Sequence, residues 1–422
     1  MAADGNLAGL EAARAEAYAL PLEKLNPAQP ELFQADAMWP IFERLRAEDP
    51  VHYCTEHELG PYWSITKYND IMAIDTNHQV FSSDFMLGGI TIAGGQSNMD
   101  PLPMFIAMDP PKHDVQRKAV TPAVSPMNLA LLAPQIRERA GQILDSLPIG
   151  EEFDWVDLVS KELTGMTLAT LFDMPQEDRR QLIYWSDVVT AAPGQGLIDT
   201  LEQKMAIFTE YHAYFTKLWN AKVNAPPTGD LISMLAHSPA TRNMEPREFF
   251  GNVVLLTVGG NDTTRNTITG SILALNQNPD QYAKLRADPS LIPSMVSETI
   301  RWQTPLAHMR RTALQDYEFR GKQIKKGDKV VMWYVSGNRD EEVINRPNDY
   351  IIDRERPRQH ISFGFGIHRC VGNRLAELQL TIIWEEILKR FPEVRVVAAP
   401  KRVYSTFVKG YETLSVVIPS RN

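Results

Sequence analysis

The sequence predicts a mainly α-helical fold with a minor β region. Helix-type patterns run from Pro111 almost to Asp288, interrupted by breakers such as Pro226-Pro227. Strand-type patterns are confined to short stretches: residues 51–66, which alternate around a Gly-Pro turn, residues 309–335 and residues 402–418. We therefore expect helices to form most of the molecule and a few short strands to form the rest.

Length and composition are those of one large globular domain. The chain has 422 residues and contains no Gly/Ser linker, no low-complexity tract and no internal repeat that would divide it. Apolar residues make up 44% of the chain and charged residues 23%, which can fill a core large enough to enclose a cofactor. We expect a single domain over residues 1–422, with residues 1–20 mobile or peripheral.

Charge and hydropathy exclude several classes of function. A formal net charge of -9 argues against nucleic acid as the main partner, because no basic stripe offsets the repulsion by phosphates. The longest apolar runs, such as residues 253–258, are far shorter than the roughly 20 residues needed to span a bilayer. The N-terminus lacks the features of a secretory signal, so we expect a cytoplasmic protein without a membrane span. Two lone cysteines, Cys54 and Cys370, agree with a reducing compartment, and no role is predicted for Cys54.

One of these cysteines lies in a glycine-rich loop. In the segment FGFGIHRCVG, Cys370 stands between glycines and directly before a helical pattern over residues 373–391. A thiolate in such a turn accepts backbone N–H bonds and lies at a helix N-terminus, and both effects stabilise its negative charge. This environment suits a ligand of haem iron. Two other interpretations are open: a small buried hydrophobic residue, or a nucleophile paired with His368, although a spacing of two residues across a turn rarely brings the two side chains together.

A second candidate feature is an apolar helix, which the pattern predicts over residues 246–276. Leu255, Gly259 and Thr263 follow one another at intervals of four residues and share one face of this helix. Gly259 would let a ligand approach that face closely, and the neighbouring threonines can loosen the helical ladder. Taken alone, the stretch is more often a packing helix whose threonines bond back to backbone carbonyls.

The cysteine loop resembles the haem-binding signature of the cytochrome P450 superfamily. The matching residues are Phe363, Gly364, Gly366, His368, Cys370 and Gly372, followed by Leu375 and Ala376. The resemblance implies the P450 fold, an α-helix-rich triangular prism with small β-sheets, in which haem b lies between the long central helix and the cysteine-loop helix. It also implies a haem-thiolate monooxygenase in which Cys370 ligates the iron axially and His368 lies near a haem propionate, with Phe363 and Gly364 beside the cofactor.

The predicted long helix shares in this resemblance. Thr263 and Asp262 match the acid–alcohol pair of the family's central helix. The match implies that Thr263 assists oxygen activation and delivers protons, and that Asp262 relays them from solvent. Gly259 would border the haem on the same face.

A framework motif also matches. Glu298 and Arg301 resemble the family's buried Glu-x-x-Arg pair, which a further arginine joins after the strand region. Arg354 and Arg356 are both candidates for that arginine, and the sequence leaves the choice open. The resemblance implies that this group holds the cysteine loop in place.

Two segments resemble the family's anchors for the haem propionates. His113 and Arg117 lie four residues apart after the helix start Asp-Pro-Pro, and an arginine fork suits a carboxylate. Arg311 matches the second propionate arginine, which a strand supplies in the family. The adjacent Arg310 is the rival for that assignment.

The segments expected around the substrate are apolar. The stretch between residues 81 and 105 is rich in Gly, Ser and Pro, includes Gly88-Gly89 and Gly94-Gly95, and is expected to close over a site. The predicted pocket residues are Leu87, Ile90, Leu255, Val258, Leu306, Ala307, Met309 and Phe407. Such a pocket favours a hydrocarbon or a fatty chain over a polar metabolite.

Three segments, GGNDTTRNTITG, SETIRWQTPLAHMRRTA and FGFGIHRCVGNRLAELQL, resemble the bacterial alkane and fatty-acid terminal (omega) hydroxylases of the superfamily. The resemblance spans roughly residues 105–391 and is weaker in the N-terminal part and the substrate loop. It implies hydroxylation of medium-chain alkanes or fatty acids, preferentially at the terminal carbon. A terpenoid, steroid or aromatic substrate is the alternative. A non-catalytic haem sensor or carrier of gas is an alternative of another class, against which the Asp262–Thr263 pair argues.

The resemblance further implies separate redox partners, because the chain carries no flavin or ferredoxin domain. Soluble bacterial members receive electrons from NAD(P)H through a ferredoxin reductase and a 2Fe-2S ferredoxin. Ferredoxins are acidic, so a basic patch near the cysteine loop is expected, with ordinary solvated charge as the alternative. The candidates are Arg369, Arg374, Lys112 and Lys118. We expect a monomer.

Overall fold

The computed structural model describes residues 2–93, 102–194 and 196–422. Its α-helices are α1 (Ala2–Ala19), α2 (Pro30–Gln34), α3 (Trp39–Glu48), α4 (Tyr68–Thr76), α5 (Lys112–Val120), α6 (Pro126–Asp145), α7 (Lys161–Phe172), α8 (Arg179–Thr190), α9 (Leu201–Val223), α10 (Leu231–His237), α11 (Pro246–Gln277), α12 (Pro279–Ala287), α13 (Ile292–Gln303), α14 (Tyr334–Gly337) and α15 (Asn373–Arg390). Its strands are β1 (Val51–Cys54), β2 (Tyr62–Ile65), β3 (Phe81–Ser82), β4 (Glu152–Asp154), β5 (Met309–Ala313), β6 (Tyr317–Phe319), β7 (Lys322–Ile324), β8 (Lys329–Met332), β9 (Arg395–Val396), β10 (Lys401–Arg402), β11 (Tyr411–Thr413) and β12 (Ser415–Val417). The predicted mainly α fold with a minor β region is confirmed.

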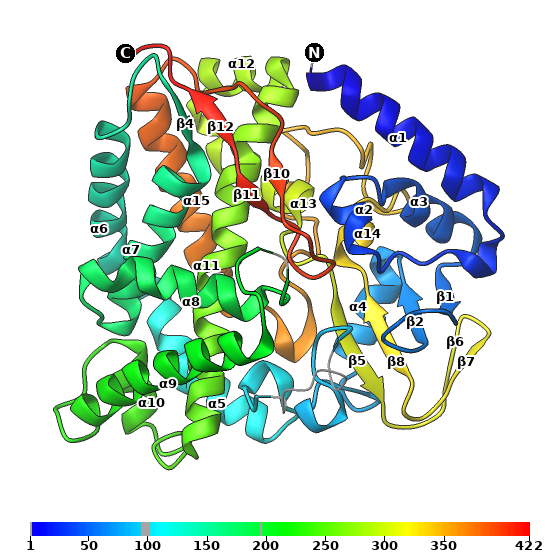
Figure 1. The fold of residues 1–422 in the computed structure, drawn as a ribbon, viewed down its shortest axis with the longest axis horizontal. Helices are drawn as coiled ribbons and strands as arrows, with labels where there is room; N and C mark the ends of the chain where they lie inside the picture. The colour runs from blue at the N-terminus through cyan, green and yellow to red at the C-terminus, as the bar shows by residue number, and fades with distance from the viewer. Residues whose placement is uncertain (1, 94–101, 195) are drawn as a thin grey trace.

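The long helix α11 runs through the middle of the molecule (Figure 1). It begins at Pro246, whose missing N–H costs nothing in a first turn, and ends before Pro279, which starts α12. Its 32 residues make a helix about 48 Å long. Helix α15 lies beside it, helices α6 to α10 lie on one side, and the largest sheet lies on the other (Figure 1).

The largest sheet has five strands in the order β1-β2-β8-β5-β3. The predicted hairpin is confirmed: β1 and β2 pair antiparallel, with Val51 opposite Ile65. Strand β8 is parallel to β2 and antiparallel to β5, with Met309 opposite Met332. Every residue of β5 and of β8 is buried, so both faces of this part of the sheet are covered. Alternate residues of β5 therefore serve two different environments.

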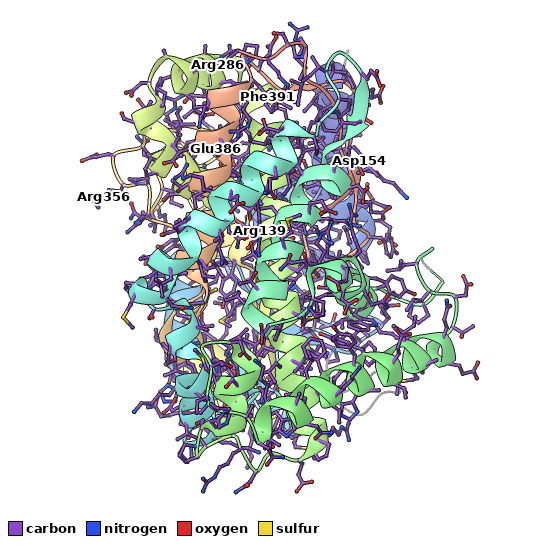
Figure 2. All side chains as sticks on the ribbon, turned by 90° about the vertical axis from the view of Figure 1, so that its left-hand side faces the viewer. Arg139, Asp154, Arg286, Arg356, Glu386 and Phe391 are labelled. Carbon is purple, nitrogen blue, oxygen red and sulfur yellow. The ribbon has the colours of Figure 1, made fainter. Side chains whose placement is uncertain are left out.

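The cysteine loop leads into the N-terminal end of α15, and the C-terminal part of α15 contacts α6. Figure 2 shows α6 crossing α15, with Glu386 on α15 and Phe391 directly after its last residue. Glu386 accepts a hydrogen bond from Arg137 of α6 at 3.0 Å, and Arg390 of α15 pairs with Asp145 of α6 at 2.8 Å. The loop before α15 is thus attached to a braced helix.

The structure contains one strand that the sequence analysis did not predict and a helix in the N-terminal segment that was expected to be mobile or peripheral. Strand β4 lies within the stretch that was expected to be helical, and it pairs with β12 near the C-terminus. A local pattern could not reveal this strand, because its partner is distant in sequence. Helix α1 lies at the edge of the molecule (Figure 1), where Arg14 pairs with Glu43 of α3 at 2.7 Å. No helix in the described ranges is long and apolar enough to cross a membrane.

Candidate active site

A cavity lies between α11 and the loop before α15, with α5 and β5 at its sides. It encloses about 1540 Å³ of space between atoms, counting its opening to solvent. Most of the predicted site residues border it together: Cys370, Phe363, Gly364 and His368 from the cysteine loop, His113 and Arg117 from α5, Arg311 and Met309 from β5, Gly259, Thr263 and Leu255 from α11, and Leu306. The fold therefore brings segments from four distant parts of the sequence to one site.

The cysteine loop is a tight turn with the Cys370 side chain open to the cavity. The Cys370 N–H donates to the Phe363 carbonyl at 2.8 Å, which closes the turn. Gly364 and Gly366 have φ angles of +67° and +65°, a conformation that favours glycine. Burial raises the pKa of the Cys370 thiol, whereas the Gly372 backbone and the charges of Arg117 and Arg369 lower it. A coordinated metal cation would deprotonate the thiol outright.

One wall of the cavity is polar and positively charged. His113 and His368 pack edge to face with ring centroids 4.3 Å apart, and Arg117 donates a hydrogen bond to the Arg369 carbonyl. Within the described part of the chain, Nε2 of His113 and both ring nitrogens of His368 are buried without a hydrogen-bond partner. Burial lowers the pKa of both imidazoles. Buried groups of this kind call for a polar ligand.

These residues fit haem b. A carboxylate-bearing ligand would satisfy the orphaned imidazole nitrogens of His113 and His368 and would pair with the guanidinium groups of Arg117 and Arg311. Cys370 on the same cavity offers a sulfur ligand. The two propionates and the iron of haem match this set of donors.

The α11 wall of the cavity is locally open. A Cβ atom built on Gly259 would meet nothing within 4 Å, so the absent side chain leaves space beside the helix. The Thr263 hydroxyl borders that space and donates to the Gly259 carbonyl at 2.9 Å. Both predicted features of this helix face, the gap and the hydroxyl, are present.

Asp262 does not border the cavity. Its fully buried carboxylate accepts hydrogen bonds from Ser186 of α8 at 3.0 Å and from Asn261 at 2.9 Å, and it pairs with Arg265 at 3.2 Å. Arg265 also pairs with Asp187 of α8. Burial raises the pKa of Asp262 to about 6, although the positive charge of Arg265 opposes this shift.

Strand β5 separates its two neighbouring arginines. Arg311 borders the cavity and pairs with the buried carboxylate of Asp75 at 2.7 Å. Arg310 points to the opposite face of the strand, where its guanidinium donates to the carbonyls of Leu87 at 3.0 Å and Gly88 at 3.4 Å. The cavity arginine is therefore Arg311, and Arg310 holds the loop near residue 88.

The framework motif forms a buried ion cluster. Glu298 accepts from Arg301 at 2.8 Å and from Arg354, also at 2.8 Å. Its carboxylate further accepts the N–H of Ile351 at 2.8 Å. Arg356 is exposed at the edge of the molecule (Figure 2). Arg354 is thus the arginine that completes the cluster.

Several predicted pocket residues lie away from the cavity. Leu87 is 44% exposed, and Ala307 is buried in another part of the core beside Trp333. Phe407 packs against the ring of His308, whereas Ile90 and Val258 are partly buried without bordering the cavity. Gly94 and Gly95 lie outside the described residues. A residue on a cavity-bordering segment can still point elsewhere, and the sequence alone did not give those directions.

Other cavity residues were missed, among them Leu168 and Leu171 of α7, Leu231 of α10 and Leu256 of α11. Phe105, at the end of the stretch that was expected to close over the site, does border the cavity, as does the adjoining Ile106. Helix spacing could have indicated Leu256, which lies seven residues before Thr263 and so shares its face of α11. Helices α7 and α10 carry no distinctive motif, so their position beside the cavity follows only from packing.

The comparisons with known proteins show which family this chain belongs to. The family model of cytochrome P450 matches residues 150–401, and the chain belongs to this family. Linalool 8-monooxygenase of Pseudomonas putida is 35% identical over 94% of this chain and 99% of its own length. Methyl-branched lipid omega-hydroxylase of Mycobacterium tuberculosis (strain ATCC 25618 / H37Rv) is 32% identical over 89% of this chain and 90% of its own length. The solved structure of CYP153D17 from Sphingomonas sp. PAMC 26605 has a TM-score of 0.87 and 47% identity, covering 94% of this chain and 100% of that chain.

The protein is therefore a cytochrome P450 monooxygenase with haem b as its cofactor. The bound haem supplies the iron that activates O2, with electrons that come from NAD(P)H through redox partners. This assignment excludes the alternative of a non-catalytic haem carrier.

Proposed function

We propose that this monooxygenase hydroxylates the terminal carbon of a medium-chain alkane or fatty acid. The carrying observation is the chemistry of the cavity wall beyond the polar side: Leu168, Leu231, Leu255 and Leu256 are all apolar. None of the described lining residues is an acid or a lysine. An alkyl chain gains free energy in such a site, whereas an isolated charge would lose its hydration without compensation.

The chain's residues have distinct proposed roles. Cys370 would hold the haem iron through its thiolate, and the thiolate would supply electron density that supports oxygen activation. Thr263 holds a proton-bearing hydroxyl at the gap beside Gly259. Asp262 is the buried acid that restores that proton. His113, Arg117, Arg311 and His368 bind the haem propionates.

The name of one relative supports hydroxylation at the end of an alkyl chain, and the name of another supports a terpenoid substrate. Omega-hydroxylase denotes attack on the last carbon of a lipid chain, and that relative covers 89% of this chain. Linalool is a terpenoid, so a terpenoid substrate is the second candidate. Steroid and aromatic substrates belong to the same alternative.

Spectral titration followed by product analysis tests the proposal. Hexane, octane, decane, octanoic acid, dodecanoic acid, linalool and a steroid are titrated, and the shift of haem iron to high spin reports their fit. We expect the largest shift and a primary alcohol with an alkane or fatty acid. Subterminal alcohols only, or turnover of linalool alone, would overturn it.

We further propose a 2Fe-2S ferredoxin as the electron donor. Arg369 and Arg374 are exposed on either side of Cys370. Lys118 is exposed on α5, and Lys112 is exposed but paired with Glu248. An acidic partner would be attracted to this surface, and the attraction would weaken as salt rises.

Charge reversal tests the donor site. Arg369→Glu and Arg374→Glu should raise the KM for ferredoxin about tenfold at low salt and leave reduction by dithionite unchanged. Lys325→Glu, at an exposed position directly after β7, is the matched control. Equal KM values for all three variants would contradict the proposed docking surface.

A further inference from the structure

Asp75, in the last turn of α4, does not border the cavity, yet it connects three segments around that cavity. Its carboxylate is buried, with 2% of the residue exposed. One oxygen accepts from Arg311 at 2.7 Å. The other accepts from the Tyr334 hydroxyl at 2.8 Å and from the Phe365 backbone N–H at 2.8 Å. Arg311 belongs to the cavity wall, and Phe365 belongs to the cysteine loop.

The glycines of the cysteine loop leave room for this residue. A Cβ on Gly366 would lie 2.7 Å from the Asp75 carbonyl oxygen, and one on Gly364 would lie 3.3 Å from its carboxylate. Real Cβ atoms do not approach backbone oxygen as closely as 2.7 Å. The loop therefore packs directly on the end of α4 at Asp75.

The bonds to Arg311 leave that side chain little freedom. One terminal nitrogen donates to Asp75, and the other donates to the Arg310 carbonyl at 2.8 Å. Arg311 is 2% exposed and Tyr334 is 3% exposed, so water does not replace these partners readily. Loss of the Asp75 charge would leave a buried guanidinium without its described counter-ion.

We propose that Asp75 is a positioning residue that holds the propionate-binding arginine and the cysteine loop in a fixed relation. It acts through Arg311 and through the Phe365 N–H, and it contacts neither the iron nor the substrate. A cofactor attached at both its iron and its carboxylate edge is retained best when the two attachments keep their spacing. The inference rests on the proposed roles of Cys370 and Arg311 and is independent of the substrate.

The test compares Asp75→Asn with Asp70→Asn. Asp70 lies on the same helix, is 5% exposed and pairs with Arg320, away from the cysteine loop. Haem transfer to apomyoglobin measures retention, and the reduced carbonyl complex separates thiolate from neutral thiol ligation. We expect Asp75→Asn to lose haem at least about tenfold faster than Asp70→Asn and to accumulate the neutral-thiol form. Rates and thiolate fractions within about twofold of each other would overturn the proposal.

Two further variants guard against a general folding defect. Tyr334→Phe removes one bond to Asp75 and keeps its charge, so haem loss should lie between those of the wild type and Asp75→Asn. In a double-mutant cycle, Asp75→Asn should add little to Arg311→Gln, because the first acts largely through the second. The proposal would be overturned if the effects of Asp75→Asn and Arg311→Gln on haem loss were fully additive and Tyr334→Phe lost haem at the wild-type rate. Asp75 would then contribute only to the general stability of the fold. A thiolate band in the wild type tests Cys370 separately, and product analysis tests the substrate.

Discussion

Thr263 and Asp262 are adjacent in the sequence but lie on different sides of α11. The Thr263 hydroxyl borders the cavity, whereas the Asp262 carboxylate is fully buried and accepts a hydrogen bond from Ser186 of α8. The ion pair with Arg265 adds a second restraint on the acid. The two groups therefore require separate tests, because one contacts the cavity and the other is held by the surrounding helices.

Asp262→Asn should slow product formation by about 10²-fold, because the amide cannot relay a proton. Haem content and substrate affinity should stay near those of the wild type. Single-turnover kinetics in H2O and D2O measure the effect, and the solvent isotope effect should rise. Asp187→Asn, which keeps the Asp262 carboxyl, is the control. A wild-type rate and isotope effect in Asp262→Asn would remove this residue from proton delivery.

Thr263→Ala should uncouple reductant use from product formation. NAD(P)H consumption should continue while the product per NAD(P)H falls about tenfold or more, because the cavity-side hydroxyl is lost. Thr263→Ser should restore much of the coupling. Thr267→Ala, one turn along the same cavity wall, is the matched control. Unchanged coupling in Thr263→Ala would contradict the role assigned to its hydroxyl.

Arg311→Gln should weaken the binding of haem, whereas Arg310→Gln should weaken the binding of substrate. Arg311→Gln should accelerate haem loss about tenfold, because a charge-assisted bond to a carboxylate is removed. Arg310→Gln should keep the haem but weaken substrate binding, because its guanidinium holds the carbonyls of Leu87 and Gly88. Haem transfer and spectral titration measure the two effects. The reverse pattern would mean that the strand faces are assigned wrongly.

Arg354→Ala should lower the free energy of unfolding by roughly 3 kcal/mol, because it leaves the buried Glu298 carboxylate with fewer partners. Arg356→Ala should change it by less than about 0.5 kcal/mol, since that side chain is exposed. Urea denaturation of the haem-bound proteins measures both. Equal losses in the two variants would contradict the selection of Arg354.

His308 should contribute to acid sensitivity. Its ring donates to the Thr406 carbonyl at 2.9 Å and accepts the Ile92 N–H at 3.3 Å, so it must remain neutral. Burial lowers the pKa of His308 to about 4, whereas an unfolded histidine has a pKa of about 6.5. Between these values the unfolded chain binds the extra proton, so the free energy of unfolding falls as pH falls through this window.

One such histidine can change the free energy of unfolding by up to about 1.4 kcal/mol per pH unit within this window. His308→Gln should flatten the fall measured by urea denaturation between pH 7 and pH 5. His57→Gln, at a partly buried position in another loop, is the control. An unchanged slope in His308→Gln would show that His308 does not set the acid response.

The main elements of the site were predictable because their signals are local. The helix expected over residues 246–276 is observed as Pro246–Gln277, and the helix expected over residues 373–391 is observed as Asn373–Arg390. Helical periodicity, a proline in the first turn and a glycine-rich turn are properties of neighbouring residues. The same holds for the β1–β2 hairpin around Gly60-Pro61.

The sequence by itself determined the P450 family, the mainly α fold and the loop of Cys370, since these depend on short motifs and on periodicity. Only the tertiary structure decided that Arg311 rather than Arg310 borders the cavity, that Arg354 joins Glu298, and that Asp75 connects the site. Each of these choices depends on which side chain meets a partner far away in the chain. The physical reason is that a buried charge or hydrogen-bonding group is satisfied by whatever the fold places beside it, and chain order does not encode that neighbour directly.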